Sequence, residues 1–188
     1  MDYYKKQLYL AQVNQQDKLI GPIERWQAHE QGICHRGFTV ILIYKNQVIL
    51  QHRHHPAFDG LYDLSFSSHP IYLEDDRLQD NLSAIYASLG REWHIEKKDL
   101  IGSLKYLDKF YYKAQDPKSK YIEHEVDYLY LAEINKLPAV NKDFAYGFNL
   151  VEINKILNTK SWRLDTPLCP WVKKISLNKF VNFFVSIA

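Results

Sequence analysis

The stretch KYIEHEVDYLYLAEI, residues 120–134, has the composition of a buried β-strand, because aliphatic, branched and aromatic residues dominate it. Within it Glu123 and Glu125 lie two residues apart, and side chains at that spacing in a strand point to the same face of the sheet. Two neighbouring carboxylates repel each other, and neither is readily buried without a partner. The sequence therefore raises the question of which groups face this pair.

Three of the eight histidines lie at positions from which they could face the two glutamates. His29 and His35 bracket the run HEQGICH, and His69 follows SFSS and precedes Pro70. Three imidazoles and two carboxylates suit a first-row divalent ion such as Zn²⁺ or Mn²⁺ better than Ca²⁺, and such an ion would offset the repulsion between the glutamates. On spacing alone a plainer interpretation stays open, in which the histidines are surface or core residues and the glutamates face solvent at a sheet edge.

Length and composition predict one globular domain over residues 1–188. The chain is 46% hydrophobic and 24% charged, with 24 Lys and Arg against 22 Asp and Glu, which is ordinary for such a domain. A net charge of +2, with the basic residues scattered, argues against nucleic acid or a membrane surface as a partner.

The cysteines and the two ends of the chain bear on its location. Cys34 and Cys169 form neither a metal-type pair nor a disulfide framework, so we expect a reducing, cytoplasmic setting. Residues 1–10 lack the apolar run of a signal peptide. The apolar run at 175–188 is too short to span a bilayer, and we expect it to form a terminal helix that packs its Phe face on the domain.

Alternating apolar patterns predict most of the strands. An early strand is expected in LYLAQVN, 8–14, and a β-hairpin in RGFTVILIYKNQVILQHR, 36–53, with its turn at 45–47. GLYDLSFSSHP, 60–70, reads as one further strand. GPIERWQAHEQG, 21–32, is bounded by Gly and Pro and reads as a connection with one short helical turn.

The second half of the chain contains both helical and strand-like patterns of apolar residues. Apolar residues at spacings of three and four predict a helix over 82–94, and strands are expected at 100–107 and 109–114. Two shorter helices are predicted at 149–157 and 169–184. Strands, a helix, more strands and then helices favour a mixed α+β or α/β sandwich over regular β-α alternation.

Several of these motifs together resemble a known family. AHEQGICHRGFTVILIYKNQVILQHR, then GLYDLSFSSHP and then EHEV resemble the type 1 isopentenyl diphosphate isomerases of the Nudix superfamily, from about Gly21 to Glu133, with a further match at CPWVKK. The resemblance implies a Nudix-type sandwich with a mixed β-sheet flanked by helices. It also implies a small diphosphate substrate, isopentenyl diphosphate, whose double bond moves by protonation of one carbon and deprotonation of another through a carbocation-like intermediate.

The resemblance also implies two metal sites. The family holds one divalent ion, Mn²⁺ or Zn²⁺ here, with three His and two Glu, which correspond to His29, His35, His69, Glu123 and Glu125. It uses a helix glutamate to hold Mg²⁺ on the substrate diphosphate. Glu92 matches that position if about five residues are inserted before the helix, a change that loop entropy tolerates.

Catalytic and substrate-binding roles carry over in the same way. Glu125 would double as the base, and Tyr112 matches a tyrosine beside the acid–base site. Trp171 matches a ring that faces the developing positive charge, although core packing explains a tryptophan there as simply. Arg25 and Arg53 match basic positions that face the diphosphate, to which guanidinium groups make forked contacts.

The chain departs from the family's pattern at three places. It lacks the glycine, the central Arg-Glu and the paired glutamates of the Nudix hydrolase motif, which bind Mg²⁺ and activate water. Ser67 stands where the family has its acidic cysteine, and a hydroxyl is a far weaker acid than a thiol. His54 and His55 stand near a missing family lysine and could meet phosphate as imidazolium ions or be exposed. The alternatives to an isomerase are thus a hydrolase of another diphosphate and a catalytically silent diphosphate-binding homologue.

Overall fold

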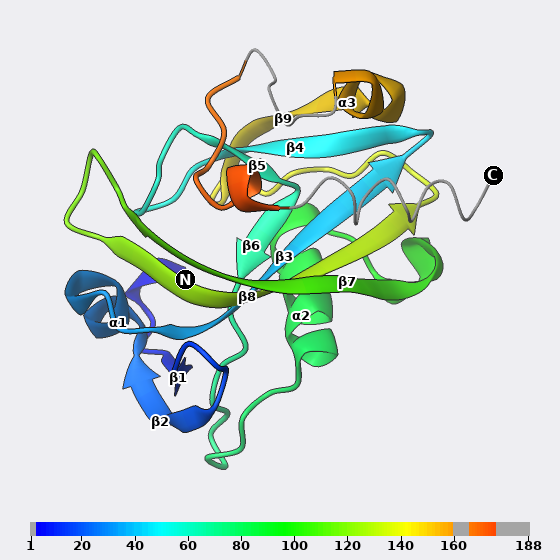
Figure 1. Ribbon diagram of the computed structural model, residues 1–188. Helices are drawn as coiled ribbons and strands as arrows, with labels where there is room; N and C mark the ends of the chain where they lie inside the picture. The colour runs from blue at the N-terminus through cyan, green and yellow to red at the C-terminus, as the bar shows by residue number, and fades with distance from the viewer. Residues whose placement is uncertain (1–2, 160–165, 176–188) are drawn as a thin grey trace.

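The computed structural model describes residues 3–159 and 166–175 (Figure 1). Nine strands form one mixed sheet in this part of the chain: β1 (Tyr9–Val13), β2 (Leu19–Glu24), β3 (His35–Tyr44), β4 (Gln47–Arg53), β5 (Tyr62–Leu64), β6 (Phe66–Ser68), β7 (Leu100–Gln115), β8 (Ile122–Ile134) and β9 (Ala145–Glu152). The helices are α1 (Arg25–Gln31), α2 (Asn81–Trp93) and α3 (Ile153–Thr159), with short 3-10 turns η1 (Tyr3–Lys5), η2 (Lys97–Asp99) and η3 (Val172–Lys174).

Strand β3 is the centre of the sheet. It runs parallel to β8 and antiparallel to β1, β4 and β6. β7 extends the sheet beyond β8, while β5 and β9 both pair with β4. The predicted fold class, a mixed sheet with flanking helices, is confirmed.

Apolar side chains of β3 alternate between two cores, as the period of a strand requires. Phe38, Val40 and Leu42 pack in one core with residues of α2. Ile41 and Ile43 pack in the other, which α3 and η3 close. Both faces of β3 are thus covered, and polar groups can gather where the strand begins, outside the two cores.

Four predicted elements are confirmed with their boundaries almost unchanged: the strand over 8–14 is β1, the strand over 120–134 is β8, the hairpin is β3–β4 and the helix is α2. The β3–β4 hairpin turns at Lys45 and Asn46, both with positive φ, as two-residue hairpin turns prefer. The helix predicted over 82–94 is α2, in which the Asp80 carboxylate caps the first turn by accepting from the Ser83 backbone N–H.

Four other predictions are wrong in detail. The strand predicted over 60–70 is broken into β5 and β6, because Ser65 has a φ of 45°. The two strands predicted over 100–107 and 109–114 are one strand, β7, which pairs with β8 along its length across two register shifts.

The connection predicted over 21–32 contains the end of β2 and all of α1, and the helix predicted over 149–157 is the end of β9 followed by α3. Of the helix predicted over 169–184, the described residues form only η3, and residues 176–188, with the proposed terminal helix, lie outside them. Among the described residues, no helix is both long and apolar enough to cross a membrane.

Candidate metal centre and adjoining pocket

The three histidines and two glutamates are brought together where β3, β8, α1 and β6 meet. His29 comes from α1, His35 begins β3, and His69 follows β6. The parallel register of β3 and β8 pairs His35 with Glu125, and the strand period turns Glu123 to the same face. One ligand atom from each of His29, His35, His69 and Glu123 lies within 4.8 Å of all the others.

The closest contacts in the cluster join imidazole nitrogens to carboxylate oxygens. His29 Nε2 lies 3.2 Å from Glu123 Oε2, and His69 Nε2 lies 2.8 Å from Glu125 Oε1. His35 Nε2 lies between the two acids, 3.5 Å from Glu125 Oε1 and 4.0 Å from Glu123 Oε2. Ligands about 2.1 Å from an ion lie at most about 4.2 Å apart, so a small contraction would bring these atoms into a first coordination shell.

The hydrogen bonds behind the cluster fit a cation at its centre. Nδ1 of His29 lies 2.7 Å from the Arg25 carbonyl and Nδ1 of His35 lies 2.8 Å from the Ile33 carbonyl. A carbonyl only accepts, so each Nδ1 carries the hydrogen and each Nε2 of a neutral ring offers a lone pair. His35 Nε2 and Glu123 Oε2 are buried without a hydrogen-bond partner among the described residues. The cluster can therefore hold a divalent metal ion.

The imidazoles already favour ionised glutamates. Burial by itself raises the pKa values of Glu123 and Glu125, but His29 beside Glu123, and His35 and His69 beside Glu125, outweigh it and hold both pKa values below the ordinary range. For His29, burial lowers the pKa, but the charge of Glu123 outweighs this and the pKa is raised. A proton on His29 Nε2, which faces Glu123, would thus have to leave before a metal ion binds there.

Metal affinity is expected to fall on acidification. An ion must displace the proton from each imidazole, and the raised pKa of His29 makes this competition begin above the ordinary histidine pKa of about 6.5. Titration calorimetry with Mn²⁺ or Zn²⁺ between pH 8 and pH 5.5 should show progressive weakening and proton release on binding. An affinity that did not change with pH would contradict metal binding through these rings.

Gly37 is needed for Glu125 to lie where it does. A Cβ added at Gly37 would stand 2.3 Å from Glu125 Oε1 and 2.6 Å from its Cδ, so the carboxylate would have to move. Gly37→Ala is expected to weaken metal binding about tenfold or more, measured by calorimetry and by metal content after dialysis. Gly147→Ala on β9 is the matched control, because its Cβ would meet nothing within 4 Å. Equal affinity for the two variants would rule out a ligand role for Glu125 in this position.

A pocket opens beside the cluster. Its walls carry most of the remaining predicted residues together with three of the five metal candidates: Arg53, His55, Ser67, Ser68, His69, Tyr112, Glu123, Glu125 and Trp171. Tyr112 lies opposite Glu125 in the β7–β8 register and donates its hydroxyl hydrogen to Glu125 Oε2. Burial first, and then Glu125, raise the pKa of Tyr112 well above its ordinary value. Tyr112 therefore remains a hydrogen-bond donor to Glu125.

Ser67 is joined to a second buried acid. Its Oγ lies 2.8 Å from Thr39 Oγ1, which in turn donates to Asp127 Oδ2 at 2.7 Å. Asp127 is fully buried, and burial first and Glu125 next raise its pKa well above the ordinary value. Glu123, Glu125 and Asp127 thus form one row on β8, and of these three only Glu123 and Glu125 are held ionised.

The predicted arginines and Glu92 also line this part of the molecule, but each already has partners. Arg25 donates through Nη2 to the backbone carbonyls of Tyr3, Tyr4 and Lys6. Arg53 pairs through Nη1 with the Asp63 carboxylate. Glu92 accepts from Gln51 and from Arg91, and it faces the same pocket as Arg25, Arg53 and His69.

His54 and His55, the two histidines considered for contact with phosphate, differ from each other. His54 is exposed and contacts the Lys142 carbonyl through Nδ1, while His55 lines the pocket. Burial first, and then Arg53, lower the pKa of His55 well below its ordinary value. At neutral pH His55 therefore meets the pocket as a neutral imidazole.

Among the residues at this site that were not predicted are Thr39, Asp63, Arg91 and Asp127. Asp127 had a signal, because it continues the alternation of Glu123 and Glu125 by one more step. Arg91 adjoins Glu92 in sequence. Thr39 and Asp63 have no local signal, since their partners come from other strands.

The fold is shared with solved structures of low sequence identity. A MutT NUDIX hydrolase from Burkholderia pseudomallei superposes with a TM-score of 0.52 at 17% identity, over 78% of this chain and 97% of that one. A C. elegans Ap4A hydrolase gives 0.54 at 12% identity, over 80% and 98%. A Deinococcus radiodurans protein gives 0.59 at 18% identity, over 80% and 87%.

The curated sequences that match the chain carry one enzyme name. An isopentenyl-diphosphate Delta-isomerase 2 of Photorhabdus laumondii is 28% identical over 88% of this chain and 89% of its own length. An isopentenyl-diphosphate Delta-isomerase of Serratia proteamaculans is 26% identical over 78% of each. No family model matches the chain. The chain thus has the Nudix fold and is similar, over most of its length, to enzymes named isopentenyl-diphosphate Delta-isomerase.

Proposed function

We propose that this chain is an enzyme that interconverts isopentenyl and dimethylallyl diphosphate by a 1,3-allylic proton shift. One observation carries the proposal: Tyr112 and Glu125 are hydrogen-bonded at the edge of the His–Glu cluster, in a pocket that also holds Ser67 and the Trp171 ring. An allylic proton shift needs a base and a proton donor within reach of two carbons of the same bound substrate. The positive charge that develops on the substrate needs an aromatic ring or a carboxylate nearby.

His29, His35, His69, Glu123 and Glu125 would hold one Mn²⁺ or Zn²⁺ ion. Such an ion supplies fixed positive charge that keeps the two carboxylates ionised. Glu125 would accept the proton through its free electron pairs, with Tyr112 fixing the carboxylate's orientation. Ser67 would deliver the proton to the other carbon, and the Trp171 ring would stabilise the charge that develops between the two steps.

The arginines would bind the diphosphate. The Nε atoms of Arg25, Arg53 and Arg91 are buried and have no hydrogen-bond partner among the described residues. After a change of side-chain conformation, these three N–H groups could donate to a bound diphosphate. Glu92 faces the same pocket and would hold the Mg²⁺ ion that accompanies the diphosphate. A small-molecule substrate and two free cysteines are consistent with a reducing cytoplasm as its setting.

Hydrolysis of another diphosphate is less well supported. Helix α2 carries a single glutamate, Glu92, and both of its carboxylate oxygens already accept hydrogen bonds. Water activation in Nudix hydrolases uses several carboxylates on that helix with Mg²⁺. The Trp171 ring would also have no task in attack on phosphorus.

Incubation with isopentenyl diphosphate and Mg²⁺ in D₂O tests the proposal. The metal-loaded protein should form dimethylallyl diphosphate with deuterium at the newly protonated carbon, followed by NMR. Release of inorganic phosphate or pyrophosphate instead would favour the hydrolase. Binding of the substrate without deuterium uptake would favour a silent diphosphate-binding homologue.

A further inference from the structure

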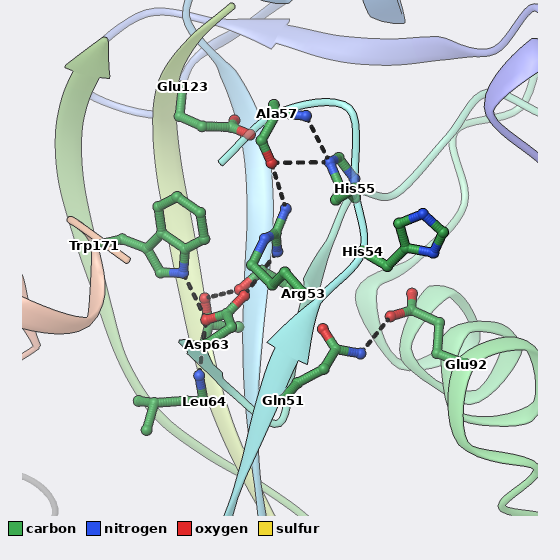
Figure 2. A network of polar contacts seen from close by, with 12 residues as sticks. Gln51, Arg53, His54, His55, Ala57, Asp63, Leu64, Glu92, Glu123 and Trp171 are labelled. Atoms are coloured by element: carbon green, nitrogen blue, oxygen red, sulfur yellow. Dashed lines mark hydrogen bonds and ion pairs between the residues drawn. The ribbon is translucent and has the colours of Figure 1, made fainter. Parts of the chain in front are cut away.

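Asp63 is a buried acid to which the mechanism above gives no role. It is the middle residue of β5 and is fully buried. Its carboxylate accepts from Arg53 Nη1 at 3.0 Å, from Trp171 Nε1 at 2.8 Å and from the Leu64 backbone N–H at 2.8 Å (Figure 2). A buried carboxylate is costly unless it is paired and hydrogen-bonded. These three donors offset part of that cost, although burial still raises the pKa of Asp63.

Asp63 is the polar anchor of the Trp171 ring. Trp171 directly precedes η3, which is only three residues long, so the backbone there supplies little rigidity. The ring packs edge-on against Phe58, with centroids 5.2 Å apart, and lies 5.8 Å from Tyr112. These apolar contacts hold the ring in place against Phe58 and Tyr112. The hydrogen bond to Asp63 fixes how the ring is turned within its own plane.

The same carboxylate sets the charge around the ring. The guanidinium carbon of Arg53 lies 5.2 Å from the Trp171 ring centroid, and an uncompensated cation there would oppose a second positive charge in the pocket. The ion pair with Asp63 neutralises it. An indole N–H that donates to an anion also leaves more electron density on the ring, and this strengthens its attraction for a cation.

We propose that Asp63 is a positioning residue for the isomerisation, which acts by anchoring the Trp171 indole and by neutralising Arg53 beside it. The proposal rests on the proposed function, in which Trp171 faces the developing positive charge. A purely structural Asp63–Arg53 pair would predict instead that loss of Asp63 lowers stability without any specific link to the Trp171 N–H.

A double-mutant cycle separates the two cases. Asp63→Asn is expected to lower kcat about tenfold and to leave KM for isopentenyl diphosphate within about threefold. Trp171→Phe keeps a ring but removes the N–H, and in that background Asp63→Asn should have little further effect. Asp75→Asn, at an exposed site, is the control with unchanged kcat. Effects that multiply in the double variant, or a change in KM alone, would overturn the proposal.

A second readout does not depend on turnover. The chain has four tryptophans, and in ¹⁵N-labelled protein the Trp171 indole N–H signal is assigned by its loss in Trp171→Phe. Asp63→Asn should shift that signal, while the signal of Trp93, in the other core, stays in place. An unmoved Trp171 signal would overturn the anchoring even in an active enzyme. If the signal shifts but the protein has no isomerase activity, the proposed function and the catalytic role of Asp63 are wrong. The hydrogen bond between Asp63 and the Trp171 ring is then still supported.

Asp63→Asn could fail to fold, because a buried Arg53 would then lack its counter-charge, and in that case Trp171→Phe alone tests the proposal. Trp171→Phe leaves the Asp63–Arg53 pair intact. Its kcat should still fall about tenfold with metal affinity unchanged. A wild-type kcat for Trp171→Phe would then overturn the proposal.

Discussion

Replacing Glu125 with Gln is expected to abolish isomerisation, by about 10³-fold or more, and to weaken divalent-metal binding about a hundredfold. The carboxylate faces His69 and His35 through Oε1 and Tyr112 through Oε2. An amide of the same shape keeps the packing but loses the negative charge and the basicity. One substitution therefore removes a ligand and the proposed base together.

The matched control for this variant is Glu133→Gln, because Glu133 lies on the same strand and is exposed. Metal affinity is measured by calorimetry, and turnover by NMR of the allylic product at saturating metal. Saturation matters because it separates loss of the ion from loss of the base. A Glu125→Gln enzyme that recovers full activity at high metal concentration would show that Glu125 is a ligand only.

Strong local patterns were sufficient for part of the fold. The hairpin of β3 and β4 follows from two alternating apolar runs around Lys45–Asn46, and α2 follows from a helical period that begins after Asp80. Both signals are carried by residues close together in sequence. The E-x-E spacing of Glu123 and Glu125 likewise predicted their common face correctly, because it depends only on the strand period.

Other elements depend on partners far away in sequence, and local patterns could not define them. β5 and β6 are separate because β5 pairs with β4 whereas β6 pairs with β3. β7 stays continuous across Gly102, with a φ of 75°, because β8 supplies a long partner strand. Residues 149–152 form a strand because β4 offers an edge to them, although their apolar spacing also fits a helix.

The candidate site also contains features that the sequence predicts and features that depend on distant strand pairing. Its five metal candidates could be named from residue types and from the family resemblance, but the sequence does not contain the parallel register that aligns His35 with Glu125. The same register brings Thr39 of β3 near Asp127 of β8. Asp63 meets Trp171 across 108 positions of sequence. Such contacts follow from the sheet order, which local periodicity does not determine.

Ser67 stands at the position where the family resemblance predicts an acidic cysteine. A serine hydroxyl remains protonated at any physiological pH, whereas a cysteine thiol has a pKa of about 8.5. Ser67 is linked through Thr39 to Asp127, so its hydrogen is already engaged in a chain of hydrogen bonds. A poor acid in this position would make protonation of the substrate the slow step.

Ser67→Cys is therefore expected to raise the rate of deuterium uptake into isopentenyl diphosphate by about a hundredfold, with metal affinity unchanged. Ser103→Cys is the control, because it adds a thiol at an exposed position of β7 that does not line the pocket. Both variants are assayed fully reduced and metal-loaded in D₂O, over pH 6 to 9. A gain confined to Ser67→Cys identifies this side of the pocket as the proton donor. Equal rates for Ser67→Cys and the wild-type protein would remove Ser67 from the acid role and favour hydrolysis or binding without turnover.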